Sequence, residues 1–259
     1  MATYISRTPA GAGDRRKWTF SCWFKLTDTS TGSRTLFASP SDGSNYNQIW
    51  FSGNDFRFDQ QTSGSPVASL VTDRKFRDPG AWMHIVCVWD SDNATPGDRM
   101  KLYVNGVEET SFSTETQPAL DYSSVMNSAV LHAIGSQEGE GYSNYGKGIL
   151  LSHVHFVDGT AYPASTFGET DSDTGEWKIK TSVSVTYGDN GFFIFKDNAS
   201  VTDLSGEGNN WTVSNGTLTP TEDCPDDIFA TLNPLNIPTS NAPTFSNGNT
   251  KGASNTTLE

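Results

Sequence analysis

The stretch Trp82-Met-His-Ile-Val-Cys-Val-Trp-Asp90 decides the fold of this chain. Its side chains alternate with the two-residue period of a β-strand, and the two sets that point to opposite faces are both largely apolar. A strand that is apolar on both faces is predicted to lie in the middle of a sheet that is covered on both sides. In this phase, Trp89 faces the core between two sheets.

The next run, Arg99-Met-Lys-Leu-Tyr-Val-Asn-Gly-Val-Glu108, predicts a partner strand and a tight turn. Leu102 and Val104 share one face of that strand. Asn105-Gly106 is the dipeptide that best tolerates the positive φ angles of a hairpin turn. The strand phases therefore predict that Val104 joins Trp89 on the inner face.

The composition is typical of a β-rich protein and excludes several classes. The 259 residues are 34% hydrophobic, and 7 Trp, 8 Tyr and 15 Phe supply a substantial core. Lys and Arg number 17 against 30 Asp and Glu, which gives a net charge of −13 and leaves no basic patch of the kind that nucleic acid or an anionic membrane requires. Nucleic acid is therefore not an expected partner.

Membrane and secretion signals are also missing from the sequence. No stretch approaches the roughly 18 apolar residues of a membrane span, and Met1–Gly13 lacks the apolar core of a signal peptide. We therefore expect no membrane insertion and folding in the cytoplasm where the chain is made. An odd number of cysteines, here three, does not indicate a set of disulfide bonds. Cys22 and Cys87 are therefore predicted to be buried thiols, and Cys224 is predicted to lie in a loop.

The rest of the chain contains many short strands, turn-rich links and no convincing helix. Residues 17–25 predict a half-buried strand with Trp23 as an exposed aromatic. Residues 148–158 predict another strand, with His153 and His155 on its surface. Evenly spaced strands without helices predict an all-β fold, namely a two-sheet antiparallel β-sandwich or jelly roll.

The composition changes character near Pro220. Residues 1–220 are predicted to form the sandwich. Residues 221–259 are rich in Pro, Asn and Thr and contain few strand formers. Such a stretch buries too little apolar surface to offset its ordering entropy, so it is predicted to be a linker or an extended tail.

Two stretches carry a resemblance to a known family. The run from Trp82 through the apolar strand to Lys101-Leu-Tyr-Val-Asn-Gly106, together with Asp203-Leu-Ser-Gly-Glu-Gly-Asn-Asn-Trp211, resembles the laminin-G or concanavalin A-like lectin/glucanase sandwich. In many laminin-G-like domains the second stretch opens the domain, whereas here it follows the hairpin, so the strand order looks circularly shifted. The resemblance implies a concanavalin A-like jelly roll.

The same arrangement resembles the lectin-like modules of bacteriophage virion proteins, particularly those of marine phages. This resemblance is carried by Ser6-Arg-Thr-Pro9, Phe156-Val-Asp-Gly159, Phe167-Gly-Glu169 and Phe229-Ala-Thr-Leu-Asn-Pro234. It implies a location in the virion, in a tail fibre or a capsid-attached appendage. Other virion proteins, a host surface glycan and further copies of the chain are then the expected partners.

The sandwich also hosts endoglucanases, whose retaining mechanism needs two carboxylates about 5 to 5.5 Å apart. In that family the carboxylates come from a strand with the pattern Glu-x-Asp-x-x-Glu. The nearest match in the sequence is Glu169-Thr-Asp-Ser-Asp-Thr-Gly-Glu176. It has no carboxylate at the sixth position of that pattern and predicts an acidic surface turn. No Gly-x-Ser-x-Gly elbow is present, and His153 and His155 lack a third ligand for a metal. The sequence therefore predicts a protein that is not an enzyme.

Calcium is the one cofactor that the sequence favours. Hard cations bind clustered carboxylate and carbonyl oxygens on a loop, and Asp197, Asp203 and Asn209 supply such oxygens. Gly206 and Gly208 let the backbone curl inward there. The resemblance also favours a structural Ca²⁺, because related lectin-like modules often hold one in such a loop. A plain turn without an ion is the alternative.

Two groups of aromatic and amide side chains are candidates for carbohydrate or partner contact. An acidic, glycine-rich loop contains Tyr142, Asn144 and Tyr145. The second group is formed by Trp23, Tyr46 and Trp50 with Asn45 and Asn47. Aromatic rings stack on sugar faces and amides bind hydroxyl groups, but protein contacts use the same residues. The loop is therefore predicted to be a contact surface rather than a defined sugar pocket.

We predict a non-enzymatic phage virion structural protein whose lectin-like domain serves adhesion or assembly. A neutral or cationic glycan is expected, because a protein with a net charge of −13 repels anionic polymers. The alternatives are a capsid decoration protein that contacts only virion subunits, and a glycan hydrolase with an unrecognised carboxylate pair.

Overall fold

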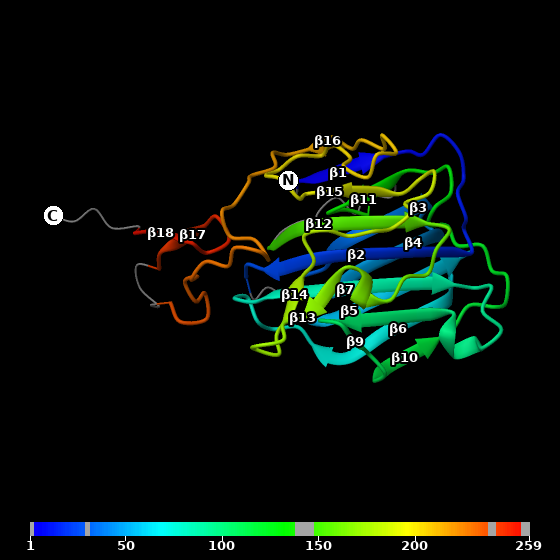
Figure 1. Ribbon diagram of the computed structural model, residues 1–259, viewed down its shortest axis with the longest axis horizontal. Coiled ribbons are helices and arrows are strands. Elements are labelled where there is room, and N and C mark those ends of the chain that lie inside the picture. The colour runs from blue at the N-terminus through cyan, green and yellow to red at the C-terminus, as the bar shows by residue number, and fades with distance from the viewer. Residues whose placement is uncertain (1–2, 29–31, 138–147, 238–241, 255–259) are drawn as a thin grey trace.

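Two antiparallel β-sheets pack face to face in the computed structural model, which describes residues 3–28, 32–137, 148–237 and 242–254 (Figure 1). Within these ranges, the eight-stranded sheet has the order β10 (Phe112–Thr116), β6 (Ser65–Lys75), β5 (Asp55–Thr62), β4 (Asn45–Ser52), β3 (Arg34–Asp42), β11 (His132–Ile134), β1 (Tyr4–Arg7), β16 (Thr212–Asn215). The six-stranded sheet has the order β15 (Phe192–Ile194), β12 (Ile149–Asp158), β2 (Lys17–Leu26), β7 (Trp82–Asp90), β8 (Met100–Val104), β9 (Val107–Glu108). The predicted all-β, two-sheet antiparallel sandwich is confirmed.

Short elements complete the described chain. The hairpins are β13 (Gly168–Thr170) with β14 (Trp177–Ile179) and β17 (Thr244–Ser246) with β18 (Lys251–Ala253). The 3-10 turns are η1 (Pro96–Asp98) and η2 (Ala164–Thr166). Among the described residues, no helix is long and apolar enough to cross a membrane.

The core between the sheets is aromatic. Trp18 of β2 lies opposite Trp89 of β7, and their rings stack with centroids 6.0 Å apart. Phe58, from β5 in the opposite sheet, lies 5.6 Å from the Trp18 ring. Trp89 and Val104 are 0% and 5% exposed and belong to this core, so their predicted inner-face phase is confirmed.

The central strands β2 and β7 are buried on both faces. On the inner face, Cys22 and Cys87 are fully buried free thiols, as predicted. On the outer face, Ser21, Val86 and Val88 are buried as well. The predicted strand that is central in its sheet and covered on both sides is therefore confirmed.

Asn105 and Gly106 form the predicted tight turn between β8 and β9. Their φ angles are 48° and 79°, in the left-handed region that favours Asn and Gly. A Cβ atom on Gly106 would lie 2.4 Å from the ring of Trp177. Glycine is therefore required here both by the backbone angle and by the close packing of that indole.

Residues 161–187 cover the outer face of the six-stranded sheet, and β13 and β14 lie in front of it in Figure 1. The ring of Trp177 lies 6.0 Å from that of His84, which stacks on Trp23 at 4.9 Å. Trp23 is consequently only 4% exposed. Its predicted exposure was wrong, because the cover comes from a segment far away in the sequence.

The two histidines of β12 are buried as well. His153 and His155 are 4% and 2% exposed, so their predicted placement on the strand surface was wrong. His155 Nδ1 lies 2.7 Å from Tyr187 Oη, and its ring stacks on Phe193 with centroids 4.0 Å apart. Partners from residues 187–193 replace the water that a surface histidine would bind.

The C-terminal segment returns to the sandwich at the end of β2. Lys25 Nζ lies 2.7 Å from Asp223 Oδ2, and both side chains are 0% exposed. Asn249 Nδ2 donates a hydrogen bond to Thr27 O at 3.0 Å. The β17–β18 hairpin lies beside one end of the sandwich (Figure 1). These contacts hold the described part of the C-terminal segment against the sandwich. The domain boundary after residue 220 stays a prediction.

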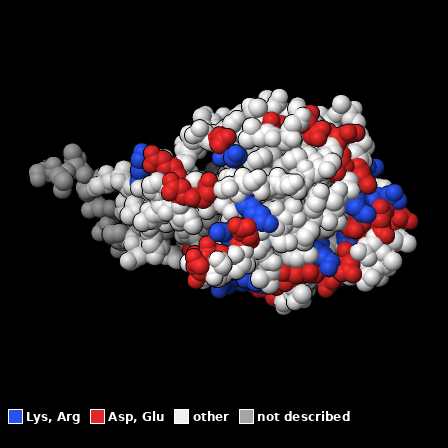
Figure 2. Space-filling view, in the orientation of Figure 1, with Lys and Arg blue, Asp and Glu red and all other residues white. Residues whose placement is uncertain are grey.

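Charged side chains are mixed on the face seen in Figure 2. Basic groups lie beside acidic ones, and a broad area between them carries neither. Ion pairs such as Lys178 with Asp171, at 3.0 Å, hold some of these charges together. The acidic excess of the chain is therefore not gathered into one patch on this face.

We expect the free energy of unfolding to decrease below about pH 6.5, the ordinary histidine pKa. Burial lowers the pKa of His84 to about 3 and that of His132 to about 4, and it also lowers the pKa of His153 and His155. The unfolded state therefore binds more protons than the folded state between these values and about 6.5, and stability is lost as the pH falls through that window. Each histidine contributes up to about 1.4 kcal/mol per pH unit.

Equilibrium urea unfolding at several values between about pH 7.5 and 5 measures this loss, because ordinary carboxylates stay ionised there. His155→Phe, which cannot be protonated, is expected to reduce the slope by one histidine's share. A free energy of unfolding that stays constant across this range would contradict neutral burial of the histidines.

Candidate functional site

Tyr46 and Trp50 lie on the outer face of the eight-stranded sheet. Both belong to β4, in which Ile49 and Phe51 point into the core and the alternate residues therefore point outward. Both rings are partly exposed, and Gln48 lies between them on the same face. The structure thus brings these two predicted contact residues together.

Strand β5 supplies polar side chains to this face. In the register of the two strands, the residues opposite Tyr46, Gln48 and Trp50 are Gln61, Asp59 and Arg57. We call these six residues the Trp50 face. Its two aromatic rings lie beside an ion pair and two amides.

The Trp50 ring is held by its neighbours. Its Nε1 donates a hydrogen bond to Asp59 Oδ2 at 2.9 Å, and Ser69 Oγ donates to Asp59 Oδ1 at 2.6 Å. Arg57 Cζ lies 5.2 Å from the ring centroid, and Arg57 Nε lies 3.1 Å from Asp59 Oδ2. Tyr46 Oη donates to Gln61 Oε1 at 2.6 Å. Such a surface loses little side-chain freedom when a ligand binds.

Only some residues of this site were predicted from the sequence. Arg57 and Asp59 were missed: their alternation with apolar residues marks the outer face of a strand, but it does not say which strand lies beside them. Tyr142, Asn144 and Tyr145 lie outside the described residues. Their role in carbohydrate or partner contact stays a prediction.

The predicted calcium loop follows β15. Asp203 Oδ1 accepts hydrogen bonds from two backbone N–H groups, and Asp203 Oδ2 accepts them from Ser205 Oγ and the N–H of Asn209. Asn209 Oδ1 accepts a hydrogen bond from the Arg7 guanidinium. Asp197 is exposed and lines a cavity beside the C-terminal segment.

This donor set does not fit a calcium ion as it stands. The side-chain oxygens of Asp203 and Asn209 are taken by protein N–H and O–H groups. Across the described ranges, no group of three or more His, Cys, Asp or Glu side chains could hold a metal ion. Calcium at this loop stays a prediction.

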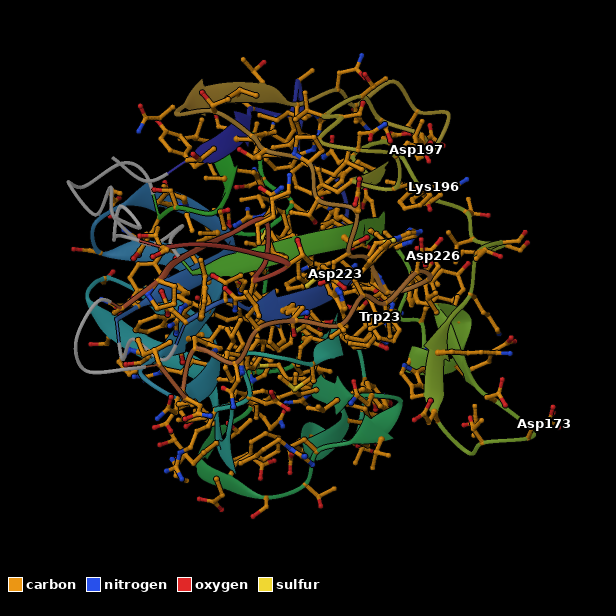
Figure 3. The ribbon with its side chains drawn as sticks, turned by 90° about the vertical axis from the view of Figure 1, so that its left-hand side faces the viewer. Trp23, Asp173, Lys196, Asp197, Asp223 and Asp226 are labelled. Atoms are coloured by element: carbon orange, nitrogen blue, oxygen red, sulfur yellow. The ribbon has the colours of Figure 1, made fainter. Side chains whose placement is uncertain are left out.

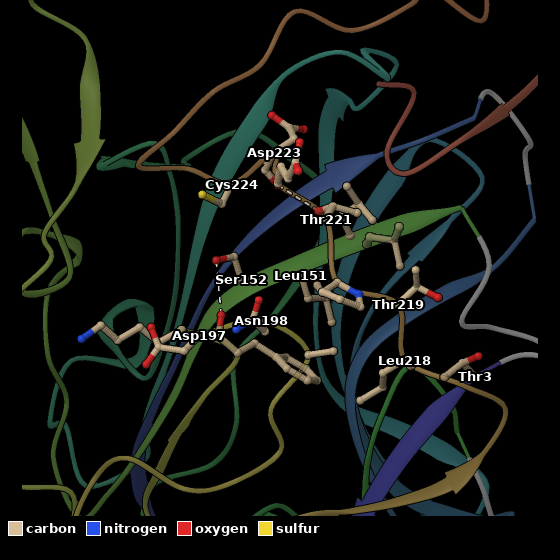
Figure 4. A pocket seen from close by; sticks show the side chains of 18 of the residues that line it. Thr3, Leu151, Ser152, Asp197, Asn198, Leu218, Thr219, Thr221, Asp223 and Cys224 are labelled. Atoms are coloured by element: carbon tan, nitrogen blue, oxygen red, sulfur yellow. Dashed lines mark hydrogen bonds between the residues drawn. The ribbon is translucent and has the colours of Figure 1, made fainter. Parts of the chain in front are cut away.

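A cavity of about 810 Å³ opens between the C-terminal segment and the sandwich (Figure 4). Residues 217–223 form one wall and cross β12, whose residues 149–152 form the floor. Residues 195–199, which follow β15, form another side. Nothing in the sequence marks this cavity, because its walls come from six separate parts of the chain.

A buried serine and histidine lie in contact without forming a catalytic pair. Ser21 Oγ lies 2.8 Å from His84 Nε2, and Trp177 Nε1 donates a hydrogen bond to His84 Nδ1 at 3.1 Å. Because Nδ1 accepts, Nε2 carries the proton and donates to the serine. A general base would have to accept the serine proton instead, and burial lowers the pKa of His84 to about 3.

The acidic run 169–176 spans the end of β13 and the turn that leads to β14. Asp171 accepts hydrogen bonds from the N–H groups of Asp173 and Thr174 at 2.9 and 3.0 Å, and it pairs with Lys178. These contacts lower the pKa of Asp171. Asp173 lies at the tip of this hairpin, away from Asp223 (Figure 3). The predicted acidic surface turn is confirmed.

Solved structures with a similar fold come from several organisms. A heptameric SAP-like pentraxin from Limulus polyphemus is 15% identical, with 76% of this chain and 90% of that chain covered and a TM-score of 0.48. A putative carbohydrate binding protein from Bacteroides ovatus is 12% identical, with 85% and 58% covered and a TM-score of 0.49. Domains LG4-5 of the mouse laminin alpha1 chain are 8% identical, with 75% and 44% covered and a TM-score of 0.44.

No curated protein matches the chain. The family described as the concanavalin A-like lectin/glucanases superfamily, of the laminin-G type, matches residues 2–161. These residues are more than half of the chain and include the β2–β7–β8 core and the Trp50 face. The chain therefore belongs to the concanavalin A-like lectin/glucanases superfamily.

Proposed function

We propose that the chain is a non-enzymatic glycan-binding module and that the Trp50 face is its contact surface. The observation that carries this proposal is the partly exposed Trp50 ring, held by Asp59 and Arg57 on the outside of a broad sheet. Membership of a superfamily that contains lectins supports a carbohydrate ligand.

The chemistry of the face suits a sugar. The apolar face of a pyranose packs against an indole ring, while its hydroxyl groups need donors and acceptors at the rim of the ring. Arg57 Nε lies 3.1 Å from Asp59 Oδ2 as an ion pair without a hydrogen bond, and within the described residues the Arg57 guanidinium donates no hydrogen bond. Its terminal Nη groups can donate to sugar hydroxyls without breaking a hydrogen bond.

The charge of the face favours a neutral sugar. Arg57 and Asp59 balance one another at 3.1 Å. Beyond this pair, the net charge of −13 repels an anionic polymer at long range. A neutral surface glycan is therefore the proposed ligand.

Binding without hydrolysis is also part of the proposal. A retaining glycosidase needs two carboxylates about 5 to 5.5 Å apart, one of which gives up a proton. Asp59 accepts hydrogen bonds at both oxygens and pairs with Arg57. These contacts favour a structural carboxylate over an acid catalyst.

We further propose that the module is carried on a phage virion, where it contacts other virion proteins and a host surface glycan. This part rests on the resemblance at residues 6–9, 156–159, 167–169 and 229–234. An image of the assembled particle that locates the chain checks it: a place at a fibre tip supports adhesion, and a place in the capsid lattice with no glycan binding supports a decoration protein.

Trp50→Ala is expected to weaken glycan binding by about 30-fold or more, because truncation of a central aromatic contact costs at least about 2 kcal/mol. A glycan array of neutral, amino and acidic sugars identifies the ligand, and isothermal titration measures its dissociation constant. The half-exposed position should leave the free energy of unfolding within about 1 kcal/mol of wild type.

Phe229→Ala is the matched control, because Phe229 is 40% exposed and lies on the C-terminal segment rather than the Trp50 face. It should bind the glycan as the wild type does. A glycan affinity that falls for Phe229→Ala and not for Trp50→Ala would reject the Trp50 face. Release of reducing sugar by the wild type would reject the non-enzymatic assignment.

Asp203→Ala is expected to lower the free energy of unfolding by about 1 to 3 kcal/mol even in a chelator, since it leaves four partly buried donors without their acceptor. Thermal unfolding of the wild type and of Asp203→Ala measures this loss, and it also tests the calcium prediction. Bound calcium would raise the wild-type melting temperature when chelator is replaced by millimolar calcium. An unchanged wild-type melting temperature would exclude a stabilising ion.

A further inference from the structure

The cavity beneath the C-terminal segment is a preformed feature, because its outer wall is fixed at both ends. At one end, Thr3 Oγ1 donates a hydrogen bond to Thr217 O at 3.2 Å. At the other end, Asp223 is held by the buried contact with Lys25 and accepts a hydrogen bond from the N–H of Phe229 at 3.1 Å. The wall between them arches over β12 (Figure 4). A volume of about 810 Å³ is large enough for a small organic ligand or for a long side chain.

Half-buried apolar side chains line the lower part of this cavity. Ile149, Leu151, Phe195 and Leu218 pack against the main core on one side and line the cavity on the other. Each therefore keeps apolar surface that water covers when the cavity holds no ligand. A ligand with an apolar body would remove that surface from water, which contributes about 25 cal/mol per Å².

The rim of the cavity is acidic. Asp197, Glu222 and Asp227 line it, and within the described ranges none of them forms an ion pair with Lys or Arg. Lys196 is the lining residue of opposite charge, while Lys25 compensates Asp223. Three uncompensated carboxylates against one ammonium leave a negative rim above an apolar floor.

We propose that this cavity binds an organic cation, namely an ammonium group carried on a short aliphatic chain. The chain packs on Leu151 and Phe195, and the ammonium lies among Asp197, Glu222 and Asp227. An anionic ligand meets the wrong charge at the rim, and a sugar without an amine gains no charge–charge attraction there. The site is independent of the Trp50 face, so the two assignments fail separately.

Three probes with the same chain length separate the contribution of charge from that of burial. Hexylammonium, 1-hexanol and hexanoate are titrated calorimetrically into the full chain. Hexylammonium is expected to bind about ten-fold more tightly than 1-hexanol, a difference of about 1.4 kcal/mol, and hexanoate more weakly than either. Equal affinities, or tighter binding of hexanoate, would overturn the proposal.

The double variant Glu222→Gln with Asp227→Asn removes two rim charges. Its affinity for hexylammonium should fall by about three- to ten-fold, the size expected of two partly exposed charge contacts, while 1-hexanol binding is unchanged. Asp173→Asn with Glu176→Gln is the matched control, because it removes the same charge from the exposed β13–β14 turn. An equal loss of hexylammonium affinity in the control variant would mean that the net charge of the chain attracts the ligand, and not the rim carboxylates.

Cys224 reports independently on occupancy of the cavity. It lines the cavity and is partly exposed, whereas Cys22 and Cys87 are fully buried. Hexylammonium should slow alkylation of Cys224 at saturating concentrations, and an unchanged rate would place the ligand elsewhere.

A Gly-Lys-Gly peptide identifies the source of the ammonium when it is compared with the same peptide carrying norleucine in place of lysine. Binding that requires the lysine assigns the site to lysine side chains of proteins. Binding of hexylammonium but not of the lysine peptide assigns the site to free amines.

Discussion

Burial of the six-stranded sheet on both faces is the constraint on which the rest of the structure depends. Strands β2 and β7 present Trp18 and Trp89 to one side and Trp23 and His84 to the other, and all four side chains are buried. Leaving either side in water would cost about 25 cal/mol per Å² of apolar surface. The chain therefore needs a second sheet on the inside and a separate layer on the outside. The eight-stranded sheet supplies the first, and residues 161–187 with the C-terminal segment supply the second.

The outer layer also sets the position of the cavity. Lys25 lies on the outer face of β2, and a buried ammonium without a counter-charge is strongly unfavourable. Asp223 supplies that charge at 2.7 Å, so the C-terminal segment must cross β12 to reach it. The segment crosses at a distance from the strand and leaves the cavity below. On the eight-stranded sheet, the Trp50 ring stays partly exposed among the described residues, so a contact surface can form there.

The sequence was informative where local pattern decides structure. The alternation in residues 82–90 predicted a doubly covered strand and the inner position of Trp89, and Asn105-Gly106 predicted the turn. Exposure of Trp23, by contrast, could not be predicted, since its cover is Trp177, which local alternation does not connect to it.

Side-chain contacts between neighbouring strands were equally hard to predict from the sequence. The pairing of Trp50 with Asp59 and Arg57 depends on register between strands, and no local pattern encodes that register. His153 and His155 were placed on the surface because alternation shows which residues share a face, but it does not show whether another segment covers that face. The contact residues proposed at Tyr142 and Tyr145 and the calcium loop at Asp197, Asp203 and Asn209 stay predictions.

Hydrogen exchange tests the central claim, which is that both faces of the six-stranded sheet are buried. Strand β4 is also interior in its sheet, but one of its faces is partly exposed, so the comparison with β7 isolates the effect of the second cover. The backbone amides of residues 84–88 should exchange only through global unfolding and more slowly than those of residues 46–50. Trp177→Ala, which removes part of the outer cover, should speed exchange in β7 more than in β4. Amides of β7 that exchange as fast as those of β4 in the wild type, or that do not respond to Trp177→Ala, would contradict the account.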